Sequence, residues 1–403
     1  MYNPPLNGVI SIRNTPLLSF VPIKGGVLYP GCTAQLVAAN SPCSIYSPGG
    51  VEPNFHTPTI QQWSFTIERQ LTKDLLLRVG YIGSEDYHMM INMDMNIPIP
   101  LVCNNPAGCL NASGGVGTVR GTPAFGTTYV PFSPTSPTNS GMANPFVSNT
   151  YSWFFAGVNR YHAANVSLVK RVSAGLGFKA NYSFSKLIDD MSANTGSTGA
   201  NEPYLIWNRY NIGLNKGSAA FNLRHQFSAN FSYELPFGAG KASGSGATGV
   251  WDKVISGWQW NGIISAQGGF PTTPQVGRNI SGTGDTRNPD VPDFNPAFTG
   301  PIVRNNPTAF SLPIPGTFGN AGRGAIRGPE LTSMDTSFFK KIPLSERFNL
   351  QFRAEMFNIL NHTNFGNPNP IVFSGNAYSA TAGVISKTAT TARQIQFALR
   401  LTF

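Results

Sequence analysis

The sequence predicts an all-β protein, an antiparallel transmembrane β-barrel, on three observations. About nine segments alternate apolar and polar residues, as strands with one apolar face do. Short and long connections alternate between these segments along the chain. The last segment ends the chain on an aromatic residue, Phe403. Together these features indicate outer-membrane strands joined by short periplasmic turns and long extracellular loops.

Alternation of side chains sets the bounds of each expected strand. In the first segment, for example, Trp63 and Phe65 lie on one face and Ser64 on the other. The seventh segment is ambiguous, because Phe338 and Phe339 fall on opposite faces. The expected strands are 59–70, 73–82, 161–171, 175–186, 223–235, 256–268, 332–342, 346–360 and 393–403.

The final strand has the clearest pattern. Its apolar parity carries Leu399, Leu401 and Phe403, and its polar parity carries Gln394, Gln396 and Arg400. Eleven residues is about the length of a tilted strand that crosses a bilayer. We therefore expect Phe403, Leu401 and Leu399 to be the signal for membrane assembly, read by the barrel assembly machinery.

The connections separate a membrane barrel from a soluble sandwich, which would also bury one face of its sheets. Counted from the C-terminus, the links 361–392, 269–331, 187–222 and 83–160 are long, whereas those between them are tight or intermediate. Structureless loops beyond about 15 residues are uncommon in soluble domains. A barrel with its long loops on one rim accounts for the pattern.

Nine is an odd number of strands, whereas bacterial single-chain barrels have an even number. Either residues 1–58 contain a further strand or the chain is part of a larger barrel. We favour the second alternative and expect the C-terminal portion of a larger barrel at 59–403. Residues 1–58 form an irregular Pro/Gly-rich segment, interpreted as part of an extracellular loop. Residues 1–5 lack the basic and apolar regions of a signal peptide.

Polar side chains opposite the apolar faces are expected to line a wet lumen, because a cation at the lipid midplane would cost about 2–4 kcal/mol. The candidate lumen-facing residues are Arg78, Arg347, Gln351, Arg353, Gln394, Gln396 and Arg400.

Four cysteines form two local pairs, Cys32/Cys43 and Cys103/Cys109, in segments expected outside the cell, where disulfides persist. Three pairings are formally open, and four unpaired thiols are a further alternative. The local pairs are the simplest expectation.

Enzymatic and cofactor chemistry find little support. No nucleophile–base or paired-carboxylate arrangement lies on a credible scaffold, so we expect no enzyme, no cofactor and no metal. Two metal sites are the alternatives: Cu(I) at the Met-rich run 88–96, and Ca²⁺ at Asp285, Asp290 and Asp293. An extended strand and solvated loop carboxylates are the simpler interpretations.

The net charge is +10, but the basic residues form no stripe and no nucleic-acid-binding module is present in the sequence, so nucleic acid is not an expected partner.

One family resemblance emerges from four runs of sequence. Residues 318–369, with the block NLQFRAEMFNILNHTNF at 349–365, resemble the C-terminal barrel of Oar-like TonB-dependent receptors. The runs ANYSFSKLIDD, LRHQFSANFSYELPFG and SGWQWNGIISAQGGFPTT resemble the same family. The resemblance implies an outer-membrane barrel of 22 strands, a plug, and coupling to the TonB complex through N-terminal parts that this sequence does not contain.

Three functions are therefore open. The first is a receptor-like barrel fragment that, in the full protein, binds an unknown extracellular ligand and imports it across the outer membrane of a Gram-negative bacterium. The second is a surface-display or adhesive barrel without transport. The third is a truncated, non-functional receptor fragment. In each case outer-membrane lipid is the expected surrounding of the strands.

Overall fold

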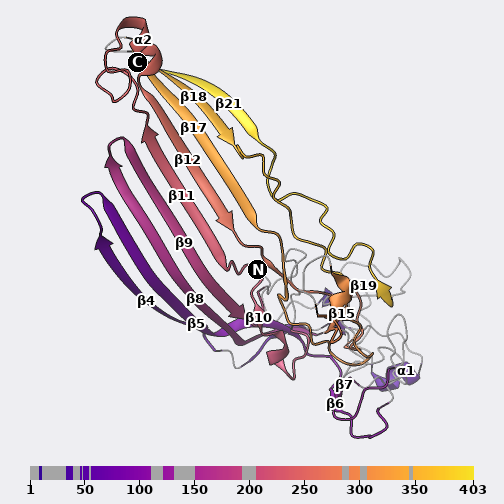
Figure 1. Cartoon of the computed structure of the whole chain (residues 1–403). Coiled ribbons are helices and arrows are strands. Elements are labelled where there is room, and N and C mark those ends of the chain that lie inside the picture. The colour runs from indigo at the N-terminus through magenta and orange to yellow at the C-terminus, as the bar shows by residue number, and fades with distance from the viewer. Residues whose placement is uncertain are drawn as a thin grey trace, which may run out of the picture.

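The computed structural model describes residues 9–10, 33–39, 46–47, 49–53, 56–109, 121–130, 150–192, 206–283, 290–299, 306–344 and 348–403. One large antiparallel sheet dominates (Figure 1). Its main path runs β21-β18-β17-β12-β11-β9-β8-β5-β4, so strands adjacent in this path follow one another along the chain. The antiparallel all-β architecture predicted from the sequence is confirmed.

The nine strands of the main path are β4 (Thr59–Gln70), β5 (Leu75–Asp94), β8 (Tyr151–Ser173), β9 (Leu176–Asp189), β11 (His225–Glu234), β12 (Trp258–Gln267), β17 (Leu331–Pro343), β18 (Asn349–Phe357) and β21 (Gln394–Thr402). The short elements are β1 (Val9–Ile10), α1 (Ala34–Ala38), β2 (Tyr46–Ser47), β3 (Gly50–Val51), β6 (Leu101–Val102), β7 (Thr128–Tyr129), η2 (Ile212–Asn215), β10 (Gly217–Ser218), α2 (Gly249–Ile255), β13 (Pro271–Thr272), β14 (Asp293–Phe294), η3 (Pro307–Ala309), β15 (Phe310–Ser311), β16 (Ile326–Arg327), β19 (Phe373–Ser374) and β20 (Ala377–Tyr378).

β5 continues to Asp94, in agreement with the interpretation of the Met-rich run as an extended strand. β8 is longer than predicted, because it begins at Tyr151, about ten residues before its expected start. A register shift between Asp86 and Met89, where His88 has a φ of 56°, marks where the pattern changes. Beyond this bulge Ile91 and Met93 are buried against Ile206, so the Met-rich run is a strand packed on a loop.

Strand pairing places like side chains in rows across the sheet. Phe65 pairs with Tyr81, Tyr81 with Ala164, and Ala164 with Phe184. At the other edge Ala354 pairs with Phe397. This face, which we call the apolar face, carries most of the exposed hydrophobic side chains of the strands, including Phe397 at 71% exposure.

The pairing also resolves the ambiguity of β17. Phe338 lies on the apolar face, stacked on Trp260 with ring centroids 6.1 Å apart. Phe339 lies on the opposite face, beneath the guanidinium of Arg353 at 5.2 Å. The aromatic ring of Phe339 therefore serves a cation–π contact on the polar side of the sheet.

Tight turns close one end of the sheet. Ala174 and Gly175, between β8 and β9, both have positive φ, 48° and 81°, as a two-residue type I′ turn requires. β4 and β5 are joined by 71–74, and β17 and β18 by 344–348. The link 235–257 is longer and contains α2, which Figure 1 shows at this same end of the sheet.

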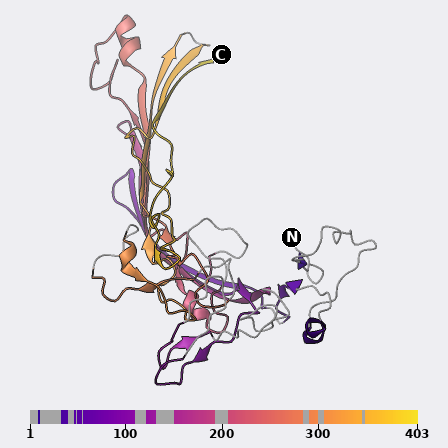
Figure 2. The same ribbon diagram turned by 90° about the vertical axis from the view of Figure 1, so that its right-hand side faces the viewer.

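Long links gather at the other end (Figures 1 and 2). Residues of 190–224, 268–330 and 358–393 pack together there around a hydrophobic core, and we call this assembly the loop cap. Its buried core consists of Trp207, Val276, Ile280, Val291, Ala309, Phe310, Ala321, Ile326, Val372 and Phe373. The alternation of short and long connections is therefore confirmed, and the long ones form packed structure. None of the helices in the described part of the chain has the length and apolar character needed to cross a membrane.

Candidate functional site

The polar face of the sheet is the first candidate site. It lies opposite the apolar face and collects the polar parity of each strand. Gln351 pairs with Arg400, Arg353 with Ala398, and Glu355 with Gln396 across β18 and β21. Arg78 pairs with Glu68 across β4 and β5. The described lumen candidates thus share one face, whereas Arg347 lies outside the described residues.

Several charged side chains on this face have a polar partner beside them. The Arg78 Nε lies 2.6 Å from Glu68 Oε1, in an ion pair whose side chains are about half exposed. Gln396 Nε2 donates to Glu355 Oε2 at 2.6 Å. Arg353 donates from Nε and Nη2 to Gln351 Oε1 at 3.0 and 2.8 Å. The guanidinium of Arg353 is therefore held flat between an amide oxygen and the Phe339 ring.

A hollow of about 630 Å³ opens over the polar face near the turns. Lys179, Asp335 and Glu355 supply charges of both signs to its lining. Asn230, Ser232, Asn261 and Ser337 supply uncharged hydrogen-bonding groups. Its size lies within the range of small-molecule sites, and Val169, Ile263 and Phe357 add apolar groups to its lining.

The loop cap holds the second candidate site, a cluster around Arg323. The Arg323 and Asp189 side chains are only 1% and 3% exposed, and they form an ion pair. Arg323 also donates from Nε to the Asn215 carbonyl at 2.7 Å and from Nη1 to Ser192 Oγ at 3.1 Å. One guanidinium therefore joins three separate parts of the chain: the end of β9, the following loop, and the link before β17.

Next to this pair, Asp190 receives the backbone N–H of Val158 at 2.9 Å. Burial raises the pKa of Asp190, although this hydrogen bond and the charge of Arg323 oppose the shift. Arg323 is thus the cation that stabilises two adjacent carboxylates at the rim of the sheet.

Asp290 is a buried carboxylate inside the cap. Its Oδ2 accepts the backbone N–H groups of Ile280 and Ser281 at 2.5 and 2.6 Å, and its Oδ1 accepts the Ser281 hydroxyl at 2.9 Å. Burial raises the pKa of Asp290 to about 6, against the opposing effect of these hydrogen bonds. The expectation of a solvated loop carboxylate is therefore wrong for Asp290, because the loop folds into a core.

The part of the chain that the structure describes contains no group of three or more His, Cys, Asp or Glu residues placed to hold a metal ion. Asp285 lies outside the described residues. Asp293, the third carboxylate of the alternative Ca²⁺ site, accepts the backbone N–H of Asn320 at 2.9 Å.

Asp290 makes the stability of the cap depend on pH. Because its folded pKa is above the unfolded value, the folded cap binds the proton more tightly, and its stability falls as pH rises from about 4 to 6. A shift of about two units corresponds to roughly 3 kcal/mol. We expect Asp290→Asn to remove this pH-dependent part of the stability of the loop cap. Hydrogen exchange of cap amides between pH 4 and 7 would measure the change. Wild-type and D290N curves of equal slope would contradict the assignment.

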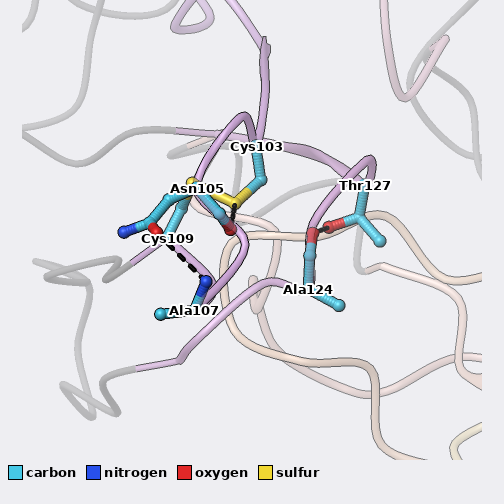
Figure 3. The surroundings of a disulfide bond; sticks show 6 residues. All are labelled: Cys103, Asn105, Ala107, Cys109, Ala124 and Thr127. Carbon is cyan, nitrogen blue, oxygen red and sulfur yellow. Dashed lines mark hydrogen bonds between the residues drawn. A yellow bond between two sulfur atoms is a disulfide. The ribbon is translucent and has the colours of Figure 1, made fainter.

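A disulfide joins Cys103 and Cys109 in the link between β5 and β8, with an S–S distance of 2.09 Å and Cα atoms 5.6 Å apart (Figure 3). The Asn105 side chain accepts the Ala107 N–H at 3.0 Å inside the small loop that the bond closes. Cys32 and Cys43 lie outside the described residues, so their pairing stays a prediction.

Sequence reasoning found neither the ion pair of Arg323 with Asp189 nor the buried carboxylate of Asp290. Arg323 lies in the run 318–369, and Asp189 and Asp190 end the run 180–190, so two of the runs that carried the resemblance hold the paired charges. The sequence signal for this site was the presence of charged residues among Gly- and Asn-rich loops. The pairing of Arg323 with Asp189 could not be predicted, because more than a hundred residues separate the two.

Comparison with known proteins places this geometry in a family. A family model described as "Outer membrane beta barrel domain" matches residues 1–396. Comparison with curated proteins gave no match.

Solved structures with a similar arrangement include the outer membrane transporter YddB from Escherichia coli, at 10% identity and a TM-score of 0.46, over 88% of this chain and 34% of that one. The FrpB iron transporter from Neisseria meningitidis aligns at 9% identity and a TM-score of 0.35, over 88% and 32%. The copper transporter OprC aligns at 7% identity and a TM-score of 0.31, over 89% and 34%. The chain thus spans about a third of each of these proteins, and likenesses this remote carry no argument about its function.

The family match covers nearly the whole chain and agrees with the strand pattern, the one-sided loops and the apolar face. The chain belongs to the family of outer membrane beta barrel domains, and its location is the outer membrane of a Gram-negative bacterium.

Proposed function

We propose that the chain is the C-terminal part of a TonB-dependent receptor-like barrel of the Oar-like kind, which in the full protein binds an extracellular substrate and imports it. The observation that carries this proposal is the pairing of a polar sheet face with a packed cap of long loops at one end. In this arrangement the cap meets the ligand outside the cell and the polar face lines its route. The resemblance of 318–369 supports the choice of subfamily.

The orientation follows from the same assignment. The apolar face of 59–403 contacts outer-membrane lipid, and Arg78, Gln351, Arg353, Gln394, Gln396 and Arg400 face the lumen. Segment 1–58 belongs to an extracellular loop. A sheet of this kind cannot leave an edge in hydrocarbon, so β4 and β21 pair with further strands in the complete barrel.

The genomic DNA upstream of the Met1 codon tests the proposal. We expect an in-frame continuation that encodes a signal peptide, a plug with a TonB-binding segment, and more alternating strands. The TonB complex would act through those parts. A continuation with strands but no plug would favour the surface-display alternative, and a stop codon or an unrelated gene would favour a truncated, non-functional fragment.

The C-terminal residues serve assembly in this proposal. Phe403 is 91% exposed, and its ring lies 6.5 Å from that of Phe348. Together with Leu401 and Leu399 it would be bound by the barrel assembly machinery. We expect deletion of Phe403 from the full-length protein to lower the amount of heat-resistant, folded barrel in outer membranes several-fold. An unchanged amount would contradict the role, and deletion of Ser345, in the link between β17 and β18, is the matched control for loss of one residue.

A further inference from the structure

The link between β11 and β12 differs from the other links at the turn end because it carries a helix with an exposed apolar stripe. Val250, Trp251 and Val254 in α2 are 79%, 72% and 50% exposed. Their spacing of i, i+1 and i+4 places them within about 100° of arc on one side of the helix. Exposed apolar side chains that share one side of a helix mark a contact surface.

The helix is fixed to the apolar face of the sheet. The Val254 carbonyl, at the end of α2, accepts the Trp258 Nε1–H at 3.0 Å and the Lys340 ammonium at 2.9 Å. Lys340 also donates to the Ser256 carbonyl at 2.5 Å and lies 4.9 Å from the Trp258 ring centroid. Trp258 and Lys340 pair across β12 and β17 in a row of the apolar face.

The other end of the link is fixed as well. The Asp252 carboxylate accepts the Ala239 backbone N–H at 2.8 Å and the Ser256 hydroxyl. These bonds join α2 to the turn at 236–243, so the helix keeps a set position while its stripe stays largely exposed. The side chains of Val250, Trp251 and Val254 are therefore presented outward by a rigid link.

An apolar hollow lies between the helix and the strands. Its volume is about 510 Å³, and Leu235, Phe237, Val254, Ile255 and Trp258 supply its apolar lining. Leu235 and Trp258 belong to the apolar face, so the hollow continues that face past the strand ends. Lys253, exposed in the last turn of α2, adds a cation beside the stripe.

From these observations we infer that the link 235–257 is a membrane anchor, in which α2 lies in the phospholipid leaflet at the turn end of the barrel. Trp251 sits at the level of the headgroups, and Val250 and Val254 contact the upper acyl chains. The hollow takes part of one acyl chain, and Lys253 reaches the phosphates. The apolar face of the sheet already requires lipid around it, and the hollow continues that face. A short helix that carries Trp and Lys beside an apolar stripe suits the interface between membrane and water.

The inference rests on the proposed function, in which the apolar face contacts lipid. The test distinguishes failure of the anchor from failure of that orientation. The full-length protein is reconstituted in vesicles of phosphatidylethanolamine and phosphatidylglycerol whose acyl chains are brominated near the headgroup. Bromine quenches tryptophan at short range, so the signal of one tryptophan is the difference between wild type and its Trp→Phe variant. Trp251→Phe reports on α2, Trp260→Phe on the apolar face, and Trp207→Phe on the buried core of the loop cap.

We expect Trp251 and Trp260 to be quenched by the brominated lipid, with Trp251 protected from aqueous acrylamide at least twofold relative to its signal in the unfolded protein. Trp207 should not respond to the lipid. If Trp260 is quenched and Trp251 is not, the anchor is refuted and the proposed orientation stands. If neither is quenched, the anchor and the proposed orientation both fail. Because Trp251 is exposed, its replacement by Phe does not threaten folding.

Discussion

Replacing Arg323 by methionine is expected to destabilise the loop cap by about 3–5 kcal/mol, because it leaves the Asp189 carboxylate buried without its cation. The pair is almost fully buried, and Arg323 also satisfies the Asn215 carbonyl and Ser192. Those groups would lose a charged donor together. The free energy of local opening, from hydrogen exchange of cap amides in the membrane-inserted protein, measures the loss.

Two further variants test whether burial of the ion pair causes this loss of stability. Arg78→Met breaks an ion pair that is about half exposed, so its effect on stability should stay within about 1 kcal/mol. Adding Asp189→Leu to Arg323→Met removes the uncompensated charge, and the double variant should recover part of the loss. Equal losses for Arg323→Met and Arg78→Met would show that burial of the pair has no special role.

Val166→Arg is expected to lower the stability of the inserted barrel by about 2–4 kcal/mol, the cost of a cation at the lipid midplane. Val166 lies on the apolar face of β8, halfway between His162 and Lys170, which share that face. Its neighbours across the strands are Val79 and Tyr182, which offer no counter-charge.

The neighbouring position provides the control. Asn165→Arg introduces the same side chain one residue away, on the polar face, where we expect a change below about 1 kcal/mol. Urea unfolding of both variants in phospholipid vesicles measures the difference. If Asn165→Arg cost as much as Val166→Arg, the assignment of the two faces would be wrong.

Strand order and strand faces could be predicted from the sequence because a period of two is a local signal. Phe65 and Ser64 show opposite faces without knowledge of any partner strand. The extension of β5 to Asp94 was harder to bound, since a bulge at His88 breaks the period there. Phe339 interrupted the alternation of apolar and polar residues because its ring contacts the guanidinium of Arg353 on the neighbouring strand, which the sequence of β17 alone does not show.

The loop cap could not be predicted, because its contacts join segments that share no period. The buried Asp290 carboxylate accepts backbone N–H groups nine and ten residues earlier, and Trp207 belongs to a buried cluster with residues of two later links. Gly- and Asn-rich composition indicated loops correctly, yet it does not reveal that loops pack on one another. The candidate site was thus predictable as a face of the sheet but not as a cluster of charges.

The contact between Arg323 and Asp189 also has a consequence for the order of folding. The two residues are 134 positions apart in the chain, and β11, β12 and the intervening loops lie between them. A contact across so long a segment is costly in chain entropy until the strands between are paired. We therefore expect the cap to form last, so that resistance of its loops to an added protease during refolding reports when the sheet is complete.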